Sequence, residues 1–228
     1  MFYIVSTPIG NLNDLSLRQA YTIASSDYLL CEDTRSAATL LQYIKNKLKI
    51  NIKSGQRIVS YYKDREYDKS FKVLELFKQK RTVSLISESG TPLISDPGLY
   101  LFKLVIKNNI PYSVIPGPTA LITALVNSGF KFKSFLFTGF LPKKEKEVIK
   151  TISNFKKINS LFPDTILIFY ESTFRIIESL KIFDKLIPNA NISVCREMTK
   201  KFEEIIRGKP KELINRKYKG EITVVLSI

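Results

Sequence analysis

The chain of 228 residues contains no histidine, and this absence removes several kinds of active site. Without imidazole there is no Ser-His-Asp or Cys-His catalysis, no histidine-ligated zinc and no histidine general base. The two cysteines, Cys31 and Cys195, each close an apolar run far apart in the sequence, so we expect buried thiols rather than a disulfide. Any chemistry must use carboxylates, lysines, tyrosines, hydroxyls, backbone groups or a reactive cofactor.

Long apolar runs and the common nucleotide signatures are missing as well. No window approaches the roughly 18 uninterrupted apolar residues of a membrane span, and the opening MFYIVSTPIG lacks the basic start and apolar core of a secretory signal. We therefore expect a soluble, cytoplasmic protein without a membrane partner. No GxGxxG follows a strand and no GxxxxGK[ST] occurs, which argues against a Rossmann nicotinamide site and a P-loop. No metal site is expected.

What the chain has in excess is positive charge. It carries 36 basic and 21 acidic residues, a formal net charge of +15. Residues 1–130 hold 16 basic and 10 acidic residues, and residues 131–228 hold 20 and 11, so the shorter C-terminal part is the more basic. This favours a polyanionic partner such as nucleic acid. The 27 lysines against nine arginines leave a second interpretation open, in which drift in coding bases has produced a solvated, lysine-rich surface.

The pattern of apolar runs predicts an α/β fold with two domains. Short runs rich in β-branched residues end in small, hydroxyl or acidic residues and precede amphipathic stretches, which is typical of βα units around a parallel sheet. We place a mostly parallel N-terminal α/β domain at 1–130 and a C-terminal α/β domain with a mixed sheet at 131–228, because GFKFKSF interrupts the alternation. The expected late strands are Phe202–Arg207 and Glu221–Ile228.

Two helices, and the N-terminal caps of two helices, are predicted in detail. Apolar residues at one-face spacing predict helices over Arg65–Lys80 and Ser172–Leu186. We expect Asp33 or Thr34 to cap the helix that runs through Leu41, and Ser172 to cap the later one.

Glycine and proline gather where the strands should end, at the carboxyl edge of the sheet, where α/β proteins bind ligands. The strongest example is SESGTPLISDPG, residues Ser87–Gly98. Within it we expect Gly90, Thr91 and Pro92 to present backbone to a ligand. We expect Asp96 to cap the next helix and Pro97 to occupy its first position.

The motifs carry a family resemblance over essentially the whole chain. In order they read TPIGNL, CEDTR, SESGTPLISDPG, IPGPT, FTGFLPKKEKE, FYESTFR, CREMT and KGEITVVL. Together they resemble the bacterial ribosomal RNA small subunit methyltransferase I family of the tetrapyrrole methylases. The resemblance implies two α/β domains with S-adenosylmethionine in the cleft between them, and a homodimer. It also implies 2′-O-methylation of a cytidine in the decoding region of 16S rRNA within the small ribosomal subunit.

Carried over by motif, the resemblance implies a set of cofactor-binding residues. These are Pro8, Gly10, Gly90, Thr91, Pro92, Ile94, Ser95, Thr119, Ala120, Tyr170, Glu171, Arg196 and Glu197. The chain departs from the family pattern at Glu88, Leu93, Thr119 and Phe174, where aspartate, glycine, serine and histidine are usual. If the resemblance holds, a histidine at position 174 is not required for the reaction.

A ribose hydroxyl is a poor nucleophile, so a general base would help, and here only carboxylates are candidates. They are Glu88, Glu32, Asp33, Glu171 and Glu197. Three of them have a named structural alternative: Asp33 as a helix cap, and Glu171 and Glu197 as ion-pair partners of Arg35, Arg175 or Arg196.

Charge alone predicts an RNA-binding surface. The candidates are Arg35, Lys143, Lys144, Lys146, Lys150, Lys200 and Lys201, together with Arg207, Lys209 and Lys211. Two other functions stay open from the sequence: a methylase of the same fold acting on a small precorrin-like or protein substrate, and a non-enzymatic RNA-binding assembly factor.

Overall fold

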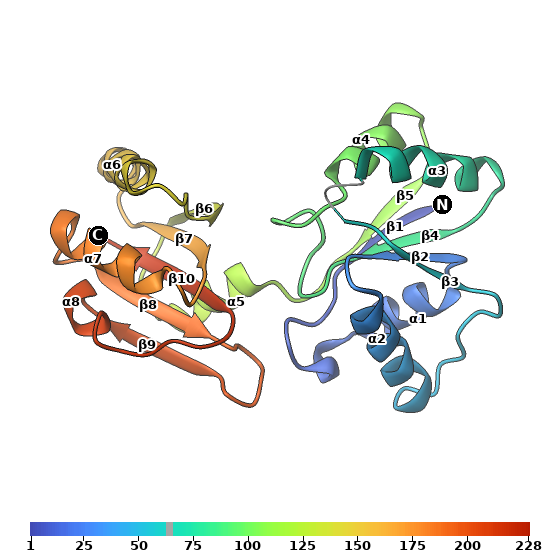
Figure 1. The fold of residues 1–228 in the computed structure, drawn as a ribbon, viewed down its shortest axis with the longest axis horizontal. Coiled ribbons are helices and arrows are strands. Elements are labelled where there is room, and N and C mark those ends of the chain that lie inside the picture. The colour runs from blue at the N-terminus through green and yellow to red at the C-terminus, as the bar shows by residue number, and fades with distance from the viewer. Residues whose placement is uncertain (63–65) are drawn as a thin grey trace. The chain divides into compact units, whose positions relative to one another are not determined.

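The computed structural model describes residues 1–62 and 66–228, which divide into two compact units, Met1–Thr119 and Ala120–Ile228 (Figure 1). The sequence placed the domain boundary near residue 130. The division comes earlier because helix α5 (Ala120–Ser128) packs on the strands of the second unit, where the Cys195 Sγ lies 3.9 Å from the carbonyl oxygen of Ala124. Both cysteines are buried free thiols, as expected.

The first unit is built on a five-stranded sheet in which every pair is parallel, in the order β3-β2-β4-β1-β5. Figure 1 shows α1 and α2 on one face and α3 and α4 side by side on the other. The predicted parallel sheet is confirmed. Its elements are β1 (Phe2–Val5), a 3-10 turn (Leu12–Asp14), α1 (Leu17–Ser25), β2 (Tyr28–Cys31), α2 (Thr34–Asn46), β3 (Arg57–Ser60), α3 (Glu66–Lys78), β4 (Val83–Ile86), α4 (Leu99–Lys107) and β5 (Tyr112–Ile115).

The second unit has a mixed sheet in the order β6-β7-β10-β8-β9, as predicted. Strand β6 runs parallel to β7, and the other pairs are antiparallel. Its elements after α5 are β6 (Ser134–Phe140), α6 (Glu145–Leu161), β7 (Thr165–Glu171), α7 (Ile176–Leu186), β8 (Asn191–Arg196), β9 (Glu204–Gly208), α8 (Pro210–Leu213) and β10 (Ile222–Ser227).

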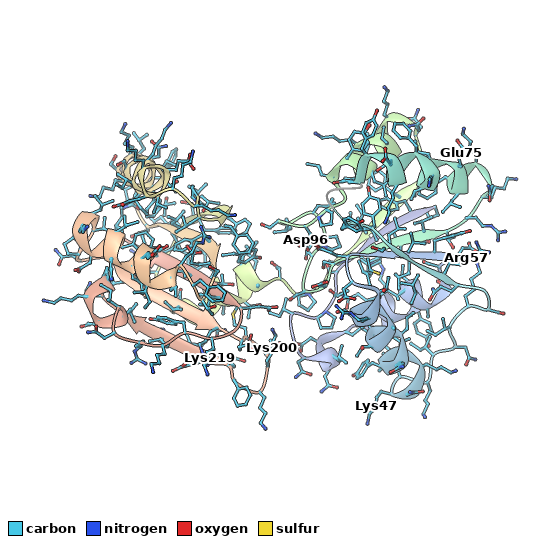
Figure 2. The ribbon with its side chains drawn as sticks, viewed as in Figure 1. Lys47, Arg57, Glu75, Asp96, Lys200 and Lys219 are labelled. Atoms are coloured by element: carbon cyan, nitrogen blue, oxygen red, sulfur yellow. The ribbon has the colours of Figure 1, made fainter. Side chains whose placement is uncertain are left out.

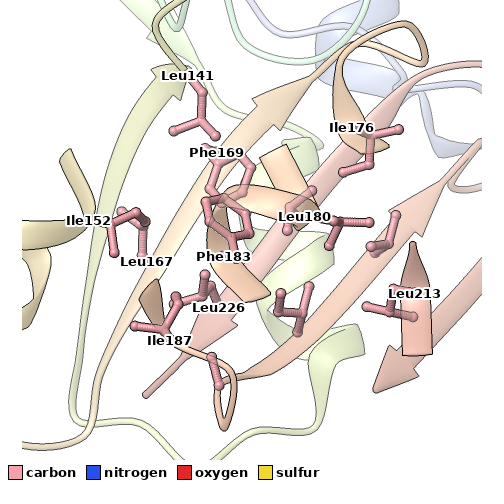
Figure 3. Close-up of a cluster of buried hydrophobic side chains, with 14 of the residues drawn as sticks. Leu141, Ile152, Leu167, Phe169, Ile176, Leu180, Phe183, Ile187, Leu213 and Leu226 are labelled. Atoms are coloured by element: carbon pink, nitrogen blue, oxygen red, sulfur yellow. The ribbon is translucent and has the colours of Figure 1, made fainter. Parts of the chain in front are cut away.

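The core of the second unit fills the space between the sheet and helices α6, α7 and α8 (Figure 3). Phe169 of β7 and Phe183 of α7 meet edge to face at its centre, with ring centroids 5.8 Å apart. Alternate residues of the strands point to this core, because side chains along a strand alternate between its faces. The core therefore fixes which face of β7 is buried, and so where Glu171 at its end must point.

Helix starts show where sequence reading succeeded and where it did not. Asp33 caps α2 as predicted, its side chain accepting a hydrogen bond from the Arg35 backbone N–H at 2.8 Å. The later helix, α7, begins only at Ile176 with Arg175 at the N-cap, and Ser172 contributes its backbone carbonyl rather than its hydroxyl. The helix predicted from Arg65 begins, among the described residues, at Glu66; Arg65 itself lies outside them.

The predicted cap of α4 is wrong. This helix begins at Leu99 with Gly98 at the N-cap, at a left-handed φ of 120°, so Asp96 and Pro97 lie before its first turn. The cap comes instead from α3: Glu66 Oε1 accepts hydrogen bonds from the backbone N–H groups of Gly98 at 3.0 Å and Tyr100 at 2.8 Å. A carboxylate at a helix N-terminus is favourable for its hydrogen bonds and its charge.

Of the helices in the described part of the chain, none combines the length and apolarity that a bilayer crossing requires.

Candidate active site

Two of the loops at the carboxyl edge of the first sheet are joined by their backbones. The Thr7 N–H donates to the Gly90 carbonyl at 2.8 Å, and the Gly90 N–H donates to the Thr7 carbonyl at 3.2 Å. The Thr7 hydroxyl adds a bond to the Ser87 carbonyl at 3.1 Å, and the Ser87 hydroxyl donates to the Gly90 carbonyl at 2.7 Å. The loop after β1 and the loop after β4 are therefore held together by hydrogen bonds.

The loop after β5 is joined to these two loops. The hydroxyls of Ser6 and Thr91 lie 3.0 Å apart, and the Thr91 hydroxyl donates to the Pro118 carbonyl at 3.4 Å. The amide of the buried Gln19 donates to the Ser6 carbonyl at 2.9 Å, and a Cβ at Gly117 would overlap this amide. Glycine at position 117 therefore lets Gln19 pass behind the three loops. We call residues 6–10, 87–98 and 116–119 the joined loops.

The backbone hydrogen-bonding groups of Gly90, which the sequence predicts to face a ligand, are engaged within the protein. Both its N–H and its carbonyl are used by Thr7. Glycine is favoured there for conformation, because φ is +87° and a Cβ would lie 3.3 Å from Ile9 Cγ2.

The loop after β4 also contains two residues in the left-handed conformation that are not glycine, Leu93 at φ 71° and Ser95 at φ 70°. Such conformations cost energy and collect at functional sites. At position 93, where the family pattern has glycine, leucine accepts the left-handed conformation while its side chain packs into the core beside α3 and α4. Packing of Leu93 against the core therefore offsets part of the energy that its left-handed conformation costs.

The predicted cofactor residues of the first unit divide by exposure. Pro8, Gly90 and Pro92 are buried and give the joined loops their shape. Gly10, Ile94 and Ser95 are exposed, and Thr91 and Thr119 are partly exposed. Small and apolar groups on fixed loops form a surface that a nucleoside-sized ligand can approach closely at little ordering cost.

In the second unit, Tyr170 and Glu171 end β7 in different environments. The Tyr170 ring packs between Phe137 and Phe140, with centroids 5.0 and 5.6 Å away. Glu171 is buried and fully engaged: one of its carboxylate oxygens pairs with the Arg175 guanidinium at 2.6 Å and accepts from the Ser172 N–H at 2.8 Å.

The other oxygen of Glu171 accepts from the Ser179 hydroxyl at 2.8 Å. Arg175 in turn donates to the carbonyls of Leu141 and Pro142, at 3.1 and 3.2 Å. The pair therefore ties the FYES motif to the FLP motif, and this contact set favours the structural alternative for Glu171 over a role as general base.

Glu197 is engaged in a similar way at a turn of the second unit. Its Oε1 accepts from the Glu221 N–H at 2.9 Å and pairs with Lys200 at 3.2 Å, and Lys200 also pairs with Glu221 at 2.9 Å (Figure 2 labels Lys200). The backbone hydrogen bond from Glu221, followed by the Lys200 ammonium, holds the pKa of Glu197 below its usual value. These bonds favour a bracing role for Glu197.

Arg196 is also occupied within the second unit. Its guanidinium donates to the Phe202 carbonyl at 2.8 Å, and its Nε lies 3.4 Å from Glu204 without the alignment of a hydrogen bond. Arg196 is therefore held by one carbonyl, and Lys200 by two carboxylates, within the second unit.

A carboxylate that sequence reading treated as a helix cap stands out at the edge of the first sheet. Asp96 is partly buried, and burial, followed by the nearby charges of Glu32 and Glu88, raises its pKa to about 6 (Figure 2). Glu32 and Glu88 are themselves exposed. Asp33 is bound by the Arg35 guanidinium at 2.7 Å, which lowers its pKa. The raised pKa of Asp96 suits a base near neutral pH.

Comparison with known proteins identifies the family. Residues 1–214 match the family model described as Tetrapyrrole (Corrin/Porphyrin) Methylases. A curated relative from Hydrogenobaculum sp. (strain Y04AAS1), named "Ribosomal RNA small subunit methyltransferase I", is 42% identical over 99% of this chain and 94% of its own length. The chain belongs to the ribosomal RNA small subunit methyltransferase I family of the tetrapyrrole methylases.

Solved structures agree on the fold of this methylase family. A diphthine synthase matches with a TM-score of 0.72 at 13% identity, covering 99% of this chain and 89% of its own. A uroporphyrin-III C-methyltransferase from Thermus thermophilus, solved with S-adenyl homocysteine, matches with a TM-score of 0.64 at 14% identity over 99% and 96%. The family resemblance read from the motifs is confirmed, and so is the class of fold.

The basic residues predicted to bind RNA in this methylase differ in availability. Lys143, Lys144, Lys146 and Lys150 are exposed along the start of α6, and Lys201 is exposed 5.5 Å from the Phe202 ring. Lys211 is also exposed. The others have structural partners: Arg35 with Asp33, Arg207 with the carbonyls of Asn127 and Ser128, and Lys209 with Asn189 and Asn191. The lysines at the start of α6 are therefore the strongest of the predicted set.

Two further observations bear on chemistry. Phe174, which departs from the family's histidine, is 93% exposed. Within residues 1–62 and 66–228, no three His, Cys, Asp or Glu side chains are grouped so as to hold a metal ion.

Proposed function

We propose that the protein transfers a methyl group from S-adenosylmethionine to the ribose 2′-hydroxyl of a cytidine in the decoding region of 16S rRNA, in the cytoplasm. The observation that carries the proposal is the near-full-length identity of 42% to a protein named ribosomal RNA small subunit methyltransferase I. The net charge of +15 supports a polyanionic substrate. The similarity to uroporphyrin and diphthine enzymes is too low in sequence to extend beyond the fold.

S-adenosylmethionine, when bound, supplies a methyl group on a positively charged sulfur that becomes neutral as the group leaves. The chain has to position the ribose hydroxyl and accept the proton that it loses. Positioning alone can contribute about 7–11 kcal/mol to lowering the barrier. A base adds about 10²–10⁴-fold. The fixed geometry of the joined loops suits the first task, and we assign a carboxylate to the second.

We assign the donor site in the first unit to the exposed part of the joined loops: Gly10, Thr91, Ile94, Ser95 and Thr119. Their support is the hydrogen-bonded frame beneath them, which Thr7, Ser87 and Gln19 hold in place. In the second unit we retain two residues for the cofactor. They are Ala120, its first residue, and Tyr170, whose ring packs between two phenylalanines. Glu171, Arg196 and Glu197 would support that site rather than contact the ligand.

We assign the proton acceptor to Asp96. It lies in the same loop as Ile94 and Ser95. It does not cap α4, because Glu66 does so, and its pKa is raised above that of an ordinary aspartate. Glu88, two residues after β4 ends, is the second choice because it is exposed.

One experiment separates this function from its rivals. Calorimetry measures binding of S-adenosylmethionine, and labelled methyl is followed into 30S subunits, naked 16S rRNA and total protein. Transfer to a single ribose in 30S subunits or rRNA is expected. Binding of the donor without transfer to RNA would contradict the proposal and favour a small-molecule or protein substrate. Absence of donor binding would favour a non-enzymatic assembly factor.

The exposed lysines at the start of α6 are expected to contact the RNA backbone. Replacing Lys143, Lys144, Lys146 and Lys150 with alanine should reduce the slope of log affinity against log salt by roughly 3, because each phosphate contact contributes about 0.7–0.9. The measurement is RNA binding between 50 and 200 mM salt, a range of roughly a half-decade.

A matched control replaces four exposed lysines of the first unit with alanine. They are Lys45, Lys47 and Lys49, at and just after the end of α2, and Lys80, just after the end of α3. This control should leave the slope nearly unchanged. Equal slopes for both quadruple variants would show that charge at α6 acts only through the net charge of the protein.

We also propose that the protein is a homodimer. Each unit has large apolar side chains exposed on its surface. They are Val114 on edge strand β5 and Ile106 on α4 in the first unit, and Val126 and Ile122 on α5 in the second. Exposed apolar patches and unpaired edge strands mark association surfaces. Light scattering should give about twice the chain mass of 26.2 kDa, and a monomer mass would contradict the proposal.

A further inference from the structure

Three aromatic rings lie together on the surface of the first unit without belonging to its core. Tyr67 and Phe71 are one turn apart on α3, with ring centroids separated by 5.2 Å. Tyr100, in the first turn of α4, lies 5.2 Å from Tyr67 and 6.5 Å from Phe71. The Tyr67 side chain is 62% exposed and that of Phe71 44% exposed, whereas the core side of α3 is formed by Val73 and its neighbours. We call Tyr67, Phe71 and Tyr100 the aromatic triad.

The aromatic triad is held rigidly. Glu66, the residue before Tyr67, accepts hydrogen bonds from the N–H groups of Gly98 and Tyr100, so the starts of α3 and α4 are fixed to each other. One turn later, the Ser70 hydroxyl donates to the Glu66 carbonyl and lies 2.7 Å from the hydroxyl of the buried Tyr61. The rings therefore need little ordering when a ligand arrives, which favours binding.

The position of the triad relates it to the proposed donor site. Helix α4 begins directly after the joined loop 87–98, and Tyr100 is four residues beyond Asp96. Both α3 and α4 begin at the carboxyl edge of the sheet, since each follows a parallel strand. The triad thus lies at the edge that carries the donor loops, and within the same unit.

The charge around the triad suits a polyanion. Helices α3 and α4 together carry five lysines and three carboxylates, and one of these carboxylates, Glu66, is used in the cap. Lys103 follows Tyr100 by one turn and is exposed, and Lys72 is exposed beside Phe71. Lys69 lies 4.6 Å from the centroid of the Tyr62 ring. Exposed aromatic faces among lysines are typical of surfaces that bind single-stranded nucleic acid.

We propose that the aromatic triad stacks unpaired bases of the RNA substrate next to the nucleotide that is methylated. The inference rests on the proposed function for the identity of the substrate. Ribose methylation requires the nucleotide to be reachable at the donor loops, and bases stacked on Tyr67 and Phe71 would hold the flanking strand there. Stacking tolerates any base, so the triad contributes affinity and placement, and sequence selection must come from elsewhere.

The test compares Tyr67→Leu/Phe71→Leu with Tyr67→Phe in direct binding to a labelled single-stranded RNA oligonucleotide and to its duplex. Leucine keeps apolar area but removes the π face, whereas phenylalanine keeps the π face. The double leucine variant should bind the single strand about tenfold to a hundredfold more weakly, with the duplex affected less than about twofold. Tyr67→Phe should bind like the wild type.

Calorimetric affinity for S-adenosylmethionine and the mass from light scattering should be the same in all three proteins. Unchanged single-strand affinity in the leucine variant would overturn the inference. So would a loss of mass, which would show that the triad contacts a second copy of the chain. Because oligonucleotide binding is measured without methyl transfer, a wild type that binds RNA but methylates none would count against the proposed function and leave the stacking result to be judged by itself.

Discussion

Asp96→Asn is expected to lower the rate of methyl transfer by about 10²–10⁴-fold, the contribution of a positioned general base. Asparagine keeps the size and polarity of the side chain but cannot take the proton from a ribose hydroxyl. Affinity for S-adenosylmethionine, measured by calorimetry, should stay within about threefold, because Asp96 is assigned to the proton and not to the donor. A rate within tenfold of the wild type would show that the proton goes elsewhere.

The pH dependence gives a second readout of the same residue. Because the pKa of Asp96 is raised to about 6, mainly by burial, the base is protonated below that pH and transfer should fall as the pH drops through 6. Glu88→Gln is the matched control in the same loop. Removing the Glu88 charge should preserve the rate at pH 8 and move the acidic midpoint to lower pH, since Glu88 is one of the charges that raise the pKa of Asp96.

Stability should move in the opposite direction to activity. The folded state holds the Asp96 proton more tightly than the unfolded chain, whose aspartate has a pKa of 3.8, so the free energy of unfolding falls as the pH rises from about 4 through 6. For a fully buried group the loss would be about 3 kcal/mol. Asp96 is partly exposed, so we expect about 1 kcal/mol. Asp96→Asn should therefore be the more stable protein at pH 8 and lose this advantage at pH 4.

The sequence located these loops correctly because its signals there are local. Apolar runs of strand length end in glycine, proline and hydroxyl residues, and the carboxyl ends of parallel strands meet at one edge. The same local reasoning gave the Asp33 cap, where acceptor and donor are two residues apart. It also allowed for the pairing of Glu171 with Arg175, which are four residues apart on neighbouring elements.

The errors arise where the partner is distant in the sequence. Asp96 was assigned to capping because the residue that caps α4, Glu66, is 32 positions away from Gly98. The pairing of the Gly90 backbone with Thr7 was missed because Thr7 belongs to the loop after the first strand. The pairing of Lys200 with Glu221 was missed because Glu221 follows 21 residues later. A single sequence does not encode these pairings in any short-range pattern, and only the packed fold brings them together.

Glu171→Ala is expected to destabilise the second unit by about 3 kcal/mol, the usual cost of removing one partner from a buried ion pair. The variant leaves the Arg175 guanidinium without its counter-charge and the Ser179 hydroxyl without its acceptor. Thermal unfolding should shift by roughly 6–12 °C, taking 2–4 °C for each kcal/mol. Glu178→Ala, at an exposed position on the following helix α7, is the control and should change stability by less than about 0.5 kcal/mol.

A double-mutant cycle decides between structure and chemistry at this carboxylate. Glu171→Ala/Arg175→Met removes both charges, so it should lose less stability than the sum of the single variants. If Glu171 only ties β7 to α7, Glu171→Gln should transfer methyl within about tenfold of the wild type at a temperature where it is folded. Loss of transfer by Glu171→Gln comparable with that of Asp96→Asn, in a folded protein, would return the proton to Glu171. The contacts to Arg175, Ser172 and Ser179 argue for the first result, because they occupy both carboxylate oxygens.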